Sequence, residues 1–180
     1  MLDSILQQSK SREPLPPLLA QNVWQPQLSR EILAADLGKE SEMTRAVRAG
    51  LLLWNDDLEN AHPIVQAPET PINNFWHAIL HRREGDFSNS HYWFRRVGTH
   101  PAFADIYNAL KSIRPHFVGH PEFGRPFPAL FKGEKWNPME FVRLCENANA
   151  ENDGVLRRIQ VIETQTLLNW CRARIEKSND

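Results

Sequence analysis

Histidine, arginine and tryptophan are concentrated in one stretch of the chain, between Phe75 and Phe103. Within it, His77, His81 and Glu84 follow one another at spacings of four and then three residues. Residues at i, i+4 and i+7 share one face of a helix, so two imidazoles and a carboxylate would form one strip. Neutral imidazole and carboxylate groups are ligands for zinc, iron and nickel. The sequence therefore allows a divalent transition-metal site with His77 and His81 plus Glu84, or His62 in its place, as ligands.

The arginines of the same stretch support another interpretation. Arg83 falls among the apolar residues of the expected helix and needs a carboxylate partner, and Arg95 borders the packing face of the next helix. Guanidinium groups donate paired hydrogen bonds to carboxylates and phosphates. Our main prediction is a cleft that binds a small anionic molecule or a peptide. Its candidate ligand-binding residues are His62, His77, His81, Arg83, Glu84, His91 and Arg95.

Three interpretations stay open at this point: the ligand-binding cleft, a metal-dependent enzyme with histidine ligands, and a helical scaffold for protein interactions. In the scaffold, the histidines would only bond to acids and carbonyl groups where helices meet. The segment "HAILH" has Ala78 where a helical metalloprotease motif would have its general-base glutamate. The chain also has no GxGxxG, Walker-type or GxSxG motif. The sequence therefore leaves undecided whether the protein is an enzyme.

An internal repeat predicts how these residues are positioned. The segment "DLENAH", Asp57 to His62, matches "DFSNSH", Asp86 to His91, at aspartate, asparagine and histidine. Each copy lies in a turn between two helical patterns, which resembles the helix hairpins of tetratricopeptide-type repeats. Stacked hairpins would bring several histidines together. Pro63 fits this arrangement if the helix that holds it starts near Asn60.

The remaining segments predict an all-α fold, a single-domain helical bundle of about six to eight helices. Residues 1–28 form a proline-containing arm on the surface, and 29–180 form the domain. Ser29 begins a helix that stops at Gly38, and a second helix covers residues 40–54. Pro101 opens a helix to about Ile113, Asn137 caps another, and a long helix ends the chain. Residues 114–136 predict a long Pro/Phe-rich loop that drapes over the helices.

Composition excludes several classes of protein. The chain has 180 residues, 41% of them hydrophobic and 24% charged, as in an ordinary globular domain. With 21 basic and 22 acidic residues, its net charge of −1 argues against nucleic-acid binding. Apolar runs are too short to span a membrane, and the N-terminal residues lack a signal-peptide pattern. Two cysteines without a CxxC motif favour the reducing cytoplasm. The oligomeric state is left open.

The histidine-rich stretch also resembles a family of uncharacterised bacterial and fungal proteins. Its signature block reads WHA, HRREGD, N, YWFRR and HP, and the similarity runs from about residue 45 to residue 172. The block falls on Trp76, His77, His81, Arg82, Arg83, Glu84, Gly85, Asp86, Asn89, Tyr92, Trp93, Phe94, Arg95, Arg96, His100 and Pro101. The resemblance gives weight to these residues and implies no particular reaction.

Overall fold

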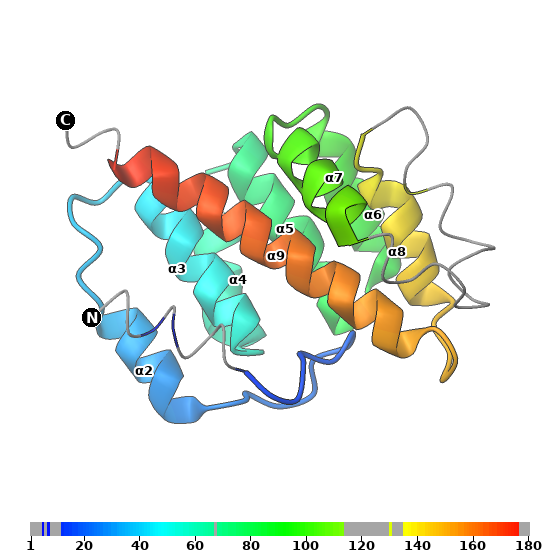
Figure 1. The fold of residues 1–180 in the computed structure, drawn as a ribbon. Helices are drawn as coiled ribbons and strands as arrows, with labels where there is room; N and C mark the ends of the chain where they lie inside the picture. Colours follow the sequence, from blue (N-terminus) through cyan, green and yellow to red (C-terminus); the bar gives the residue numbers. More distant parts are fainter. Residues whose placement is uncertain are drawn as a thin grey trace.

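The computed structural model describes residues 5, 7, 12–66, 68–113, 130 and 135–176. Within them lie eight α-helices with described bounds and no β-strand, so the all-α prediction is confirmed. In chain order (Figure 1), the helices are α2 (Pro26–Ala34), α3 (Glu42–Trp54), α4 (Leu58–Gln66), α5 (Pro71–Glu84), α6 (Phe87–Val97), α7 (Ala102–Ile113), α8 (Pro138–Glu146) and α9 (Asp153–Glu176).

Consecutive helices pack against each other, α3 with α4 and α5 with α6, and α4 also contacts α5. The long helix α9 runs diagonally across the bundle in Figure 1 and packs on α3 and α7. Helix α8 packs on α6. Short turns after α3 and α5 therefore place two helix pairs side by side. Their relation to tetratricopeptide repeats remains a prediction.

Local sequence signals set the ends of α5. Thr70 lies just before the helix, and its side chain accepts a hydrogen bond from the backbone N–H of Asn73 at 3.3 Å. Pro71 occupies the first turn, where no backbone donor is needed. Gly85 ends the helix at φ 86°, a left-handed conformation that costs glycine little. The turn that follows is tight, so α6 starts immediately at Phe87.

Helix α5 lies at the centre of the bundle and is enclosed on all sides. Every residue from Ile72 to Arg83 is buried, including His77, His81, Arg82 and Arg83 in the second half of the helix. Buried polar groups need partners, because a lost hydrogen bond to water is costly in the interior. The polar residues of α5 therefore need partners, either within the helix or on the elements packed around it.

Gly50 allows α3 to approach α5 and α9 closely. A Cβ atom at this position would lie 2.6 Å from both Leu168 Cδ2 and Trp76 Cζ2. We therefore expect Gly50→Ala to lower the free energy of unfolding by about 1–3 kcal/mol, the usual cost of overpacking a core. Gly154→Ala is the matched control, since a Cβ there meets nothing within 4 Å. Urea denaturation of both variants tests this, and equal stability of Gly50→Ala and the parent chain would contradict it.

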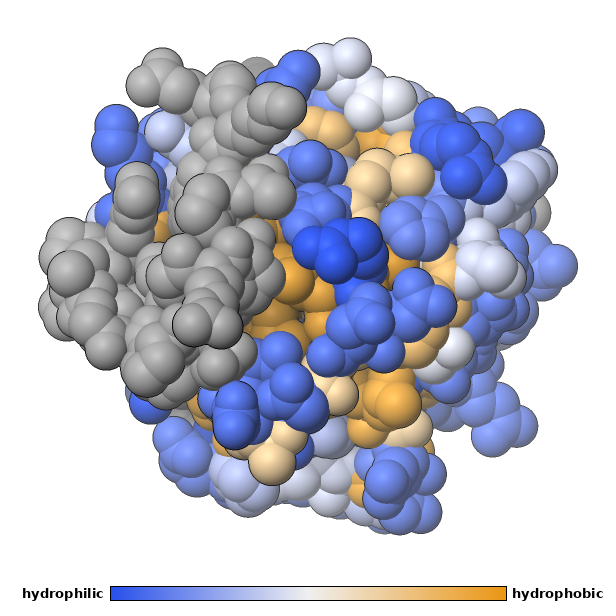
Figure 2. All heavy atoms as spheres, turned by 90° about the vertical axis from the view of Figure 1, so that its right-hand side faces the viewer, coloured by the Kyte–Doolittle hydropathy of each residue, from blue (hydrophilic) through white to orange (hydrophobic). Residues whose placement is uncertain are grey.

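The surface mixes hydrophilic and hydrophobic residues. Figure 2, which looks at the right-hand side of Figure 1, shows hydrophobic residues exposed between hydrophilic ones. Such mixing is usual, because polar residues do not suffice to cover a domain of this size. Across the part of the chain that the structure describes, no helix combines the length and the apolar character that crossing a membrane requires.

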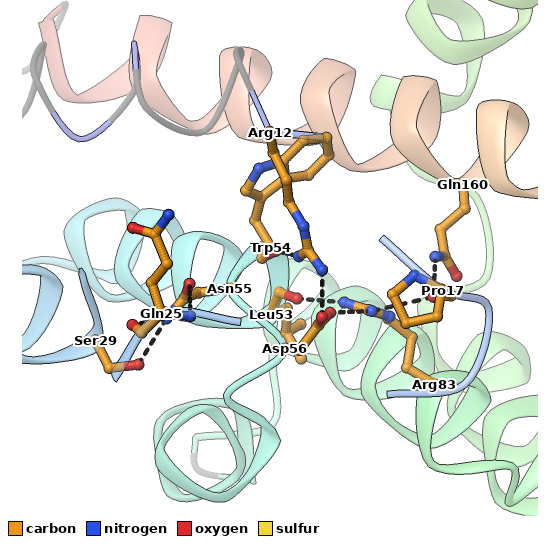
Figure 3. Close-up of polar contacts among 10 residues, drawn as sticks. All are labelled: Arg12, Pro17, Gln25, Ser29, Leu53, Trp54, Asn55, Asp56, Arg83 and Gln160. Atoms are coloured by element: carbon orange, nitrogen blue, oxygen red, sulfur yellow. Dashed lines mark hydrogen bonds and ion pairs between the residues drawn. The ribbon is translucent and has the colours of Figure 1, made fainter. Parts of the chain in front are cut away.

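The segment before α2 is more deeply anchored than the predicted surface arm. Arg12 and Leu18 are buried, and Arg12 donates to the backbone carbonyl of Trp54 and to the carboxylate of Asp56 (Figure 3). Arg83 reaches the same carboxylate from α5. The described part of the arm, from residue 12 onward, is therefore fixed to the turn after α3 by a charge network.

The bounds of two predicted helices need correction. Helix α2 starts at Pro26 rather than Ser29, because the proline fits the first turn, and it ends at Ala34, before Gly38. The predicted limit of the arm at residue 28 therefore falls inside α2. Helix α4 starts at Leu58 rather than Asn60, so Pro63 lies inside it and removes one helical hydrogen bond.

The predicted loop 114–136 lies mostly outside the described residues. Of its residues, Leu130, Lys135 and Trp136 are described, and the side chains of Leu130 and Trp136 are buried.

Candidate functional site

The repeat has a local structural cause at the start of α4 and α6. Asp57 accepts the backbone N–H of Asn60 at 3.2 Å, and Asp86 accepts that of Asn89 at 3.0 Å. Each aspartate thus satisfies a backbone donor that has no partner within its helix. Because both helices are capped at the same position, the repeat histidine lies at the same place along each. His62 on α4 contacts His77 of α5.

Three imidazoles meet between α4 and α5. The Nε2 atoms of His62 and His77 are 3.0 Å apart, and the ring of His62 lies edge-on to that of His81 at 5.4 Å. One ring nitrogen from each of the three histidines lies within 4.8 Å of the others. We call this group the histidine cluster. His77 and His81 are buried, whereas His62 is half-buried, so the cluster opens to solvent on the side of α4.

Neighbouring side chains hold the cluster in place. The ring of His77 stacks on His81 at 4.6 Å and on Trp93 of α6 at 4.1 Å. Nδ1 of His81 lies 2.9 Å from the carboxylate of Glu84, so it donates the hydrogen and leaves Nε2 with a free lone pair. The side-chain amide of Asn89 lies 3.1 Å from that Nε2 atom and can donate to it.

Burial keeps the imidazoles of His77 and His81 neutral. Desolvation, helped by the neighbouring His81 and His62, lowers the pKa of His77 from 6.5 to about 3. Desolvation also lowers the pKa of His81, although Glu84 opposes the shift. A neutral imidazole offers a lone pair without first losing a proton. At neutral pH both rings are therefore ready to accept a hydrogen bond or a metal ion.

This burial predicts acid sensitivity of the fold. Above pH 6.5, His77 is neutral in both the folded and the unfolded chain and contributes nothing to the pH dependence. Below it, the unfolded chain binds a proton that the folded chain excludes until about pH 3. The free energy of unfolding should fall over this window, by at most about 1.4 kcal/mol per pH unit from this histidine. His100, whose burial lowers its pKa to about 4, acts in the same direction.

Urea denaturation between pH 7.5 and pH 4.5 tests the acid sensitivity. His77→Gln should reduce the slope of the free energy of unfolding against pH. The reduction should correspond to about one fewer proton taken up on unfolding. An unchanged slope in this variant would show that His77 is not the group that titrates.

The arginines of the stretch do not join the histidine cluster. Arg83 donates to the carboxylate of Asp56 and to the backbone carbonyl of Leu53, on the side of α5 that faces the arm (Figure 3). Its predicted need for a carboxylate is thus met, but by a residue after α3. Arg82 is fully buried and pairs with Glu163 of α9. Their guanidinium groups are engaged in the core and are not available to an anion at the cluster.

The other predicted site residues have different positions. The carboxylate of Glu84 accepts a hydrogen bond from Nδ1 of His81, so Glu84 supports the cluster without being one of its three members. His91 is half-buried, and no described contact joins it to the cluster, although it matches His62 in the repeat. Arg95 is exposed on α6. The two cysteines are buried, and desolvation raises the pKa of each thiol to about 12, as expected for inert packing.

Sequence reasoning missed two residues of the site, Asn89 and Trp93. Both lie on α6, four residues apart, and so share the face that covers His77 and His81. The signal was present, since Asn89 is part of the repeat and both residues belong to the signature block. The position of Asn89 and Trp93 relative to the histidines of α5 depends on the turn at Gly85. The residue pattern of a single helix does not predict the geometry of that turn.

Comparison with known proteins gives no match: no family model fits the sequence, and neither the curated proteins nor the solved structures include a significantly similar chain. The resemblance of the signature block to a bacterial and fungal family therefore remains a prediction.

Proposed function

We propose that the protein binds one divalent transition-metal ion through His62, His77 and His81 and uses it to activate a water molecule. One observation carries the proposal: a nitrogen atom from each of the three rings lies within 4.8 Å of the other two. Ligands of a zinc ion at about 2.0–2.1 Å are about 3.0–3.4 Å from one another. The 3.0 Å between His62 and His77 fits this range, and small side-chain rotations would bring in His81.

The surroundings of the cluster also suit a metal ion. A metal-bound histidine usually donates its other ring nitrogen to a carboxylate or carbonyl group, which fixes the tautomer. Glu84 provides such a carboxylate for His81. The lowered pKa values of His77 and His81 keep their rings unprotonated, as ligands must be. Imidazole ligands suit zinc, copper, iron and nickel, and we propose zinc or a similar ion.

Three protein ligands leave coordination positions for water or substrate, which distinguishes catalytic from structural zinc sites. A zinc ion lowers the pKa of bound water to about 7, so hydroxide forms at neutral pH without a strong base. This matters here because Ala78 occupies the place of a metalloprotease general base. His62, His77 and His81 would hold the ion, and the chemistry that it would supply there is a lowered pKa of bound water.

Titration of chelator-treated protein with zinc, followed by calorimetry, tests the proposal. We expect one ion per chain. His62→Ala should weaken binding by more than about 100-fold, because loss of a direct ligand costs more than loss of a supporting residue. His91→Ala is the matched control, since it removes the repeat equivalent of His62 outside the cluster and should leave affinity unchanged. Equal effects of the two variants, or no saturable binding, would refute the proposal.

Glu84 should tune the affinity without being essential. Glu84→Ala removes the acceptor for the outer nitrogen of His81, and we expect zinc affinity to fall about 10- to 100-fold. Glu59→Ala, which removes an exposed acid from α4, controls for the change in net charge. The same calorimetric titration measures both variants. If Glu84→Ala binds zinc as tightly as the parent protein, its carboxylate does not support a ligand.

A further inference from the structure

The two asparagines of the repeat, Asn60 and Asn89, have different side-chain partners, although they occupy equivalent positions after their capping aspartates. The amide of Asn60 turns back to its capping residue and donates to both carboxylate oxygens of Asp57, at 3.1 and 2.9 Å. The amide of Asn89 lies instead against the ring of His81, 3.1 Å from Nε2 and 3.4 Å from Nδ1. The amide of Asn89 thus lies at the histidine cluster, whereas the amide of Asn60 bonds to its own capping aspartate.

The amide of Asn89 and a metal ion would use the same lone pair. Nδ1 of His81 donates to Glu84, so Nε2 is the acceptor for the Asn89 N–H and also the atom free to bind an ion. When an ion takes Nε2, the amide loses its acceptor and needs another. With an ion about 2.1 Å from Nε2, the amide nitrogen is at most about 5 Å from it. A donor at this distance can reach an oxygen atom that the metal binds.

The charge of the loaded site selects the kind of oxygen ligand. Three neutral imidazoles do not offset the two positive charges of the ion, and the described acid nearest to it, Glu84, is directed at the outer side of His81. An asparagine amide donates a hydrogen bond without adding charge. The open position therefore favours an anion over a neutral oxygen ligand.

We propose that the metal-loaded site binds a small oxyanion, such as a carboxylate, with one oxygen on the metal and a hydrogen bond from the side-chain amide of Asn89. This inference rests on the proposed metal site and names its ligand class. It also gives the predicted anionic ligand a physical basis, because the positive charge comes from the ion rather than from Arg83, which is engaged by Asp56. Asn89 is then a residue that selects the ligand.

Cobalt-loaded protein provides the test, because the visible absorption of cobalt(II) changes when its ligands change. Acetate should alter the spectrum at saturation, whereas acetamide, its uncharged analogue, should not. Asn89→Leu keeps the approximate volume and removes the donor, so we expect acetate to bind about tenfold or more weakly to the cobalt-saturated variant. Because the amide competes with the metal for Nε2 of His81, its removal should not lower cobalt affinity. Asn60→Leu, the repeat equivalent, should match the parent protein in both.

The outcomes distinguish failure of the proposed oxyanion binding from failure of the proposed metal site. No cobalt binding by the parent protein overturns the metal site and the inference together. Cobalt binding without an acetate response, or equal acetate affinity in Asn89→Leu, overturns the inference and leaves the metal site standing. Asn89→Asp provides a second variant if the leucine is not tolerated: its negative charge should weaken acetate binding further, and unchanged acetate affinity would also count against the inference.

Discussion

Asp56→Ala should lower the free energy of unfolding by about 3–5 kcal/mol, the range found when one partner of a buried ion pair is removed. The carboxylate accepts from Arg12 of the arm and from Arg83 of α5, and all three side chains are buried. Burial lowers the pKa of Arg83, and Asp56 acts against this shift by stabilising the charged form. Without it, two guanidinium groups would remain in the interior with no counter-charge.

The backbone adds to the effect of this substitution. Asp56 has φ 61°, the one described residue other than glycine with a positive φ, and alanine adopts this conformation less readily than aspartate or asparagine. Asp56→Asn retains the backbone preference and removes only the charge, so a smaller loss of about 1.5–3 kcal/mol is expected. Glu40→Ala, at an exposed ion pair with Arg45, should leave stability almost unchanged. Urea denaturation measures all three, and a loss below about 1 kcal/mol for Asp56→Ala would contradict this role.

Glu163→Ala should be similarly damaging, again by about 3–5 kcal/mol, because Arg82 is completely buried and Glu163 neutralises it. The guanidinium also lies over the ring of Phe141, 4.4 Å from its centre. The buried ion pair of Arg82 and Glu163 is costly to break by removing one partner. It is not needed for stability if both partners are replaced by apolar side chains. The double variant Arg82→Met with Glu163→Leu should therefore recover most of the loss, or exceed the parent stability.

The double variant also tests the division of roles along α5. Because Arg82 and Glu163 belong to the core, the double variant should bind zinc like the parent protein. A double variant that folds but has lost zinc binding would show that this ion pair is part of the site. Failure of the double variant to recover stability would show that the pair has a structural role which apolar side chains cannot replace.

Periodicity predicted the part of the site that lies on one helix. The spacing of His77 and His81 places both rings on one face of α5, and the repeat pointed to His62 as a third member. Spacing along a helix carries this information because it fixes relative direction within a turn or two. The all-α fold followed from the same patterns, together with capping signals such as Asn137, whose side chain accepts the backbone N–H of Glu140.

The partners of the arginines could not be predicted from the same patterns. The four side chains of the segment "HRRE" differ in their partners. His81 and Glu84 bond to each other beside the cluster, Arg82 pairs with α9, and Arg83 pairs with the turn after α3. Which acid lies opposite each guanidinium depends on how distant segments pack, and neighbouring residues in sequence do not determine this. The structure pairs Arg83 with Asp56 and Arg82 with Glu163, so these two guanidinium groups are already engaged.

The most direct test of the metal site is diffraction from zinc-soaked crystals, collected on both sides of the zinc absorption edge. The account predicts one anomalous peak on each chain, about 2.0–2.1 Å from a ring nitrogen of His62, His77 and His81. It also predicts that the contact between the two Nε2 atoms of His62 and His77 is replaced by the ion. Rings that still bond to each other in fully soaked crystals, with no peak between them, would contradict it.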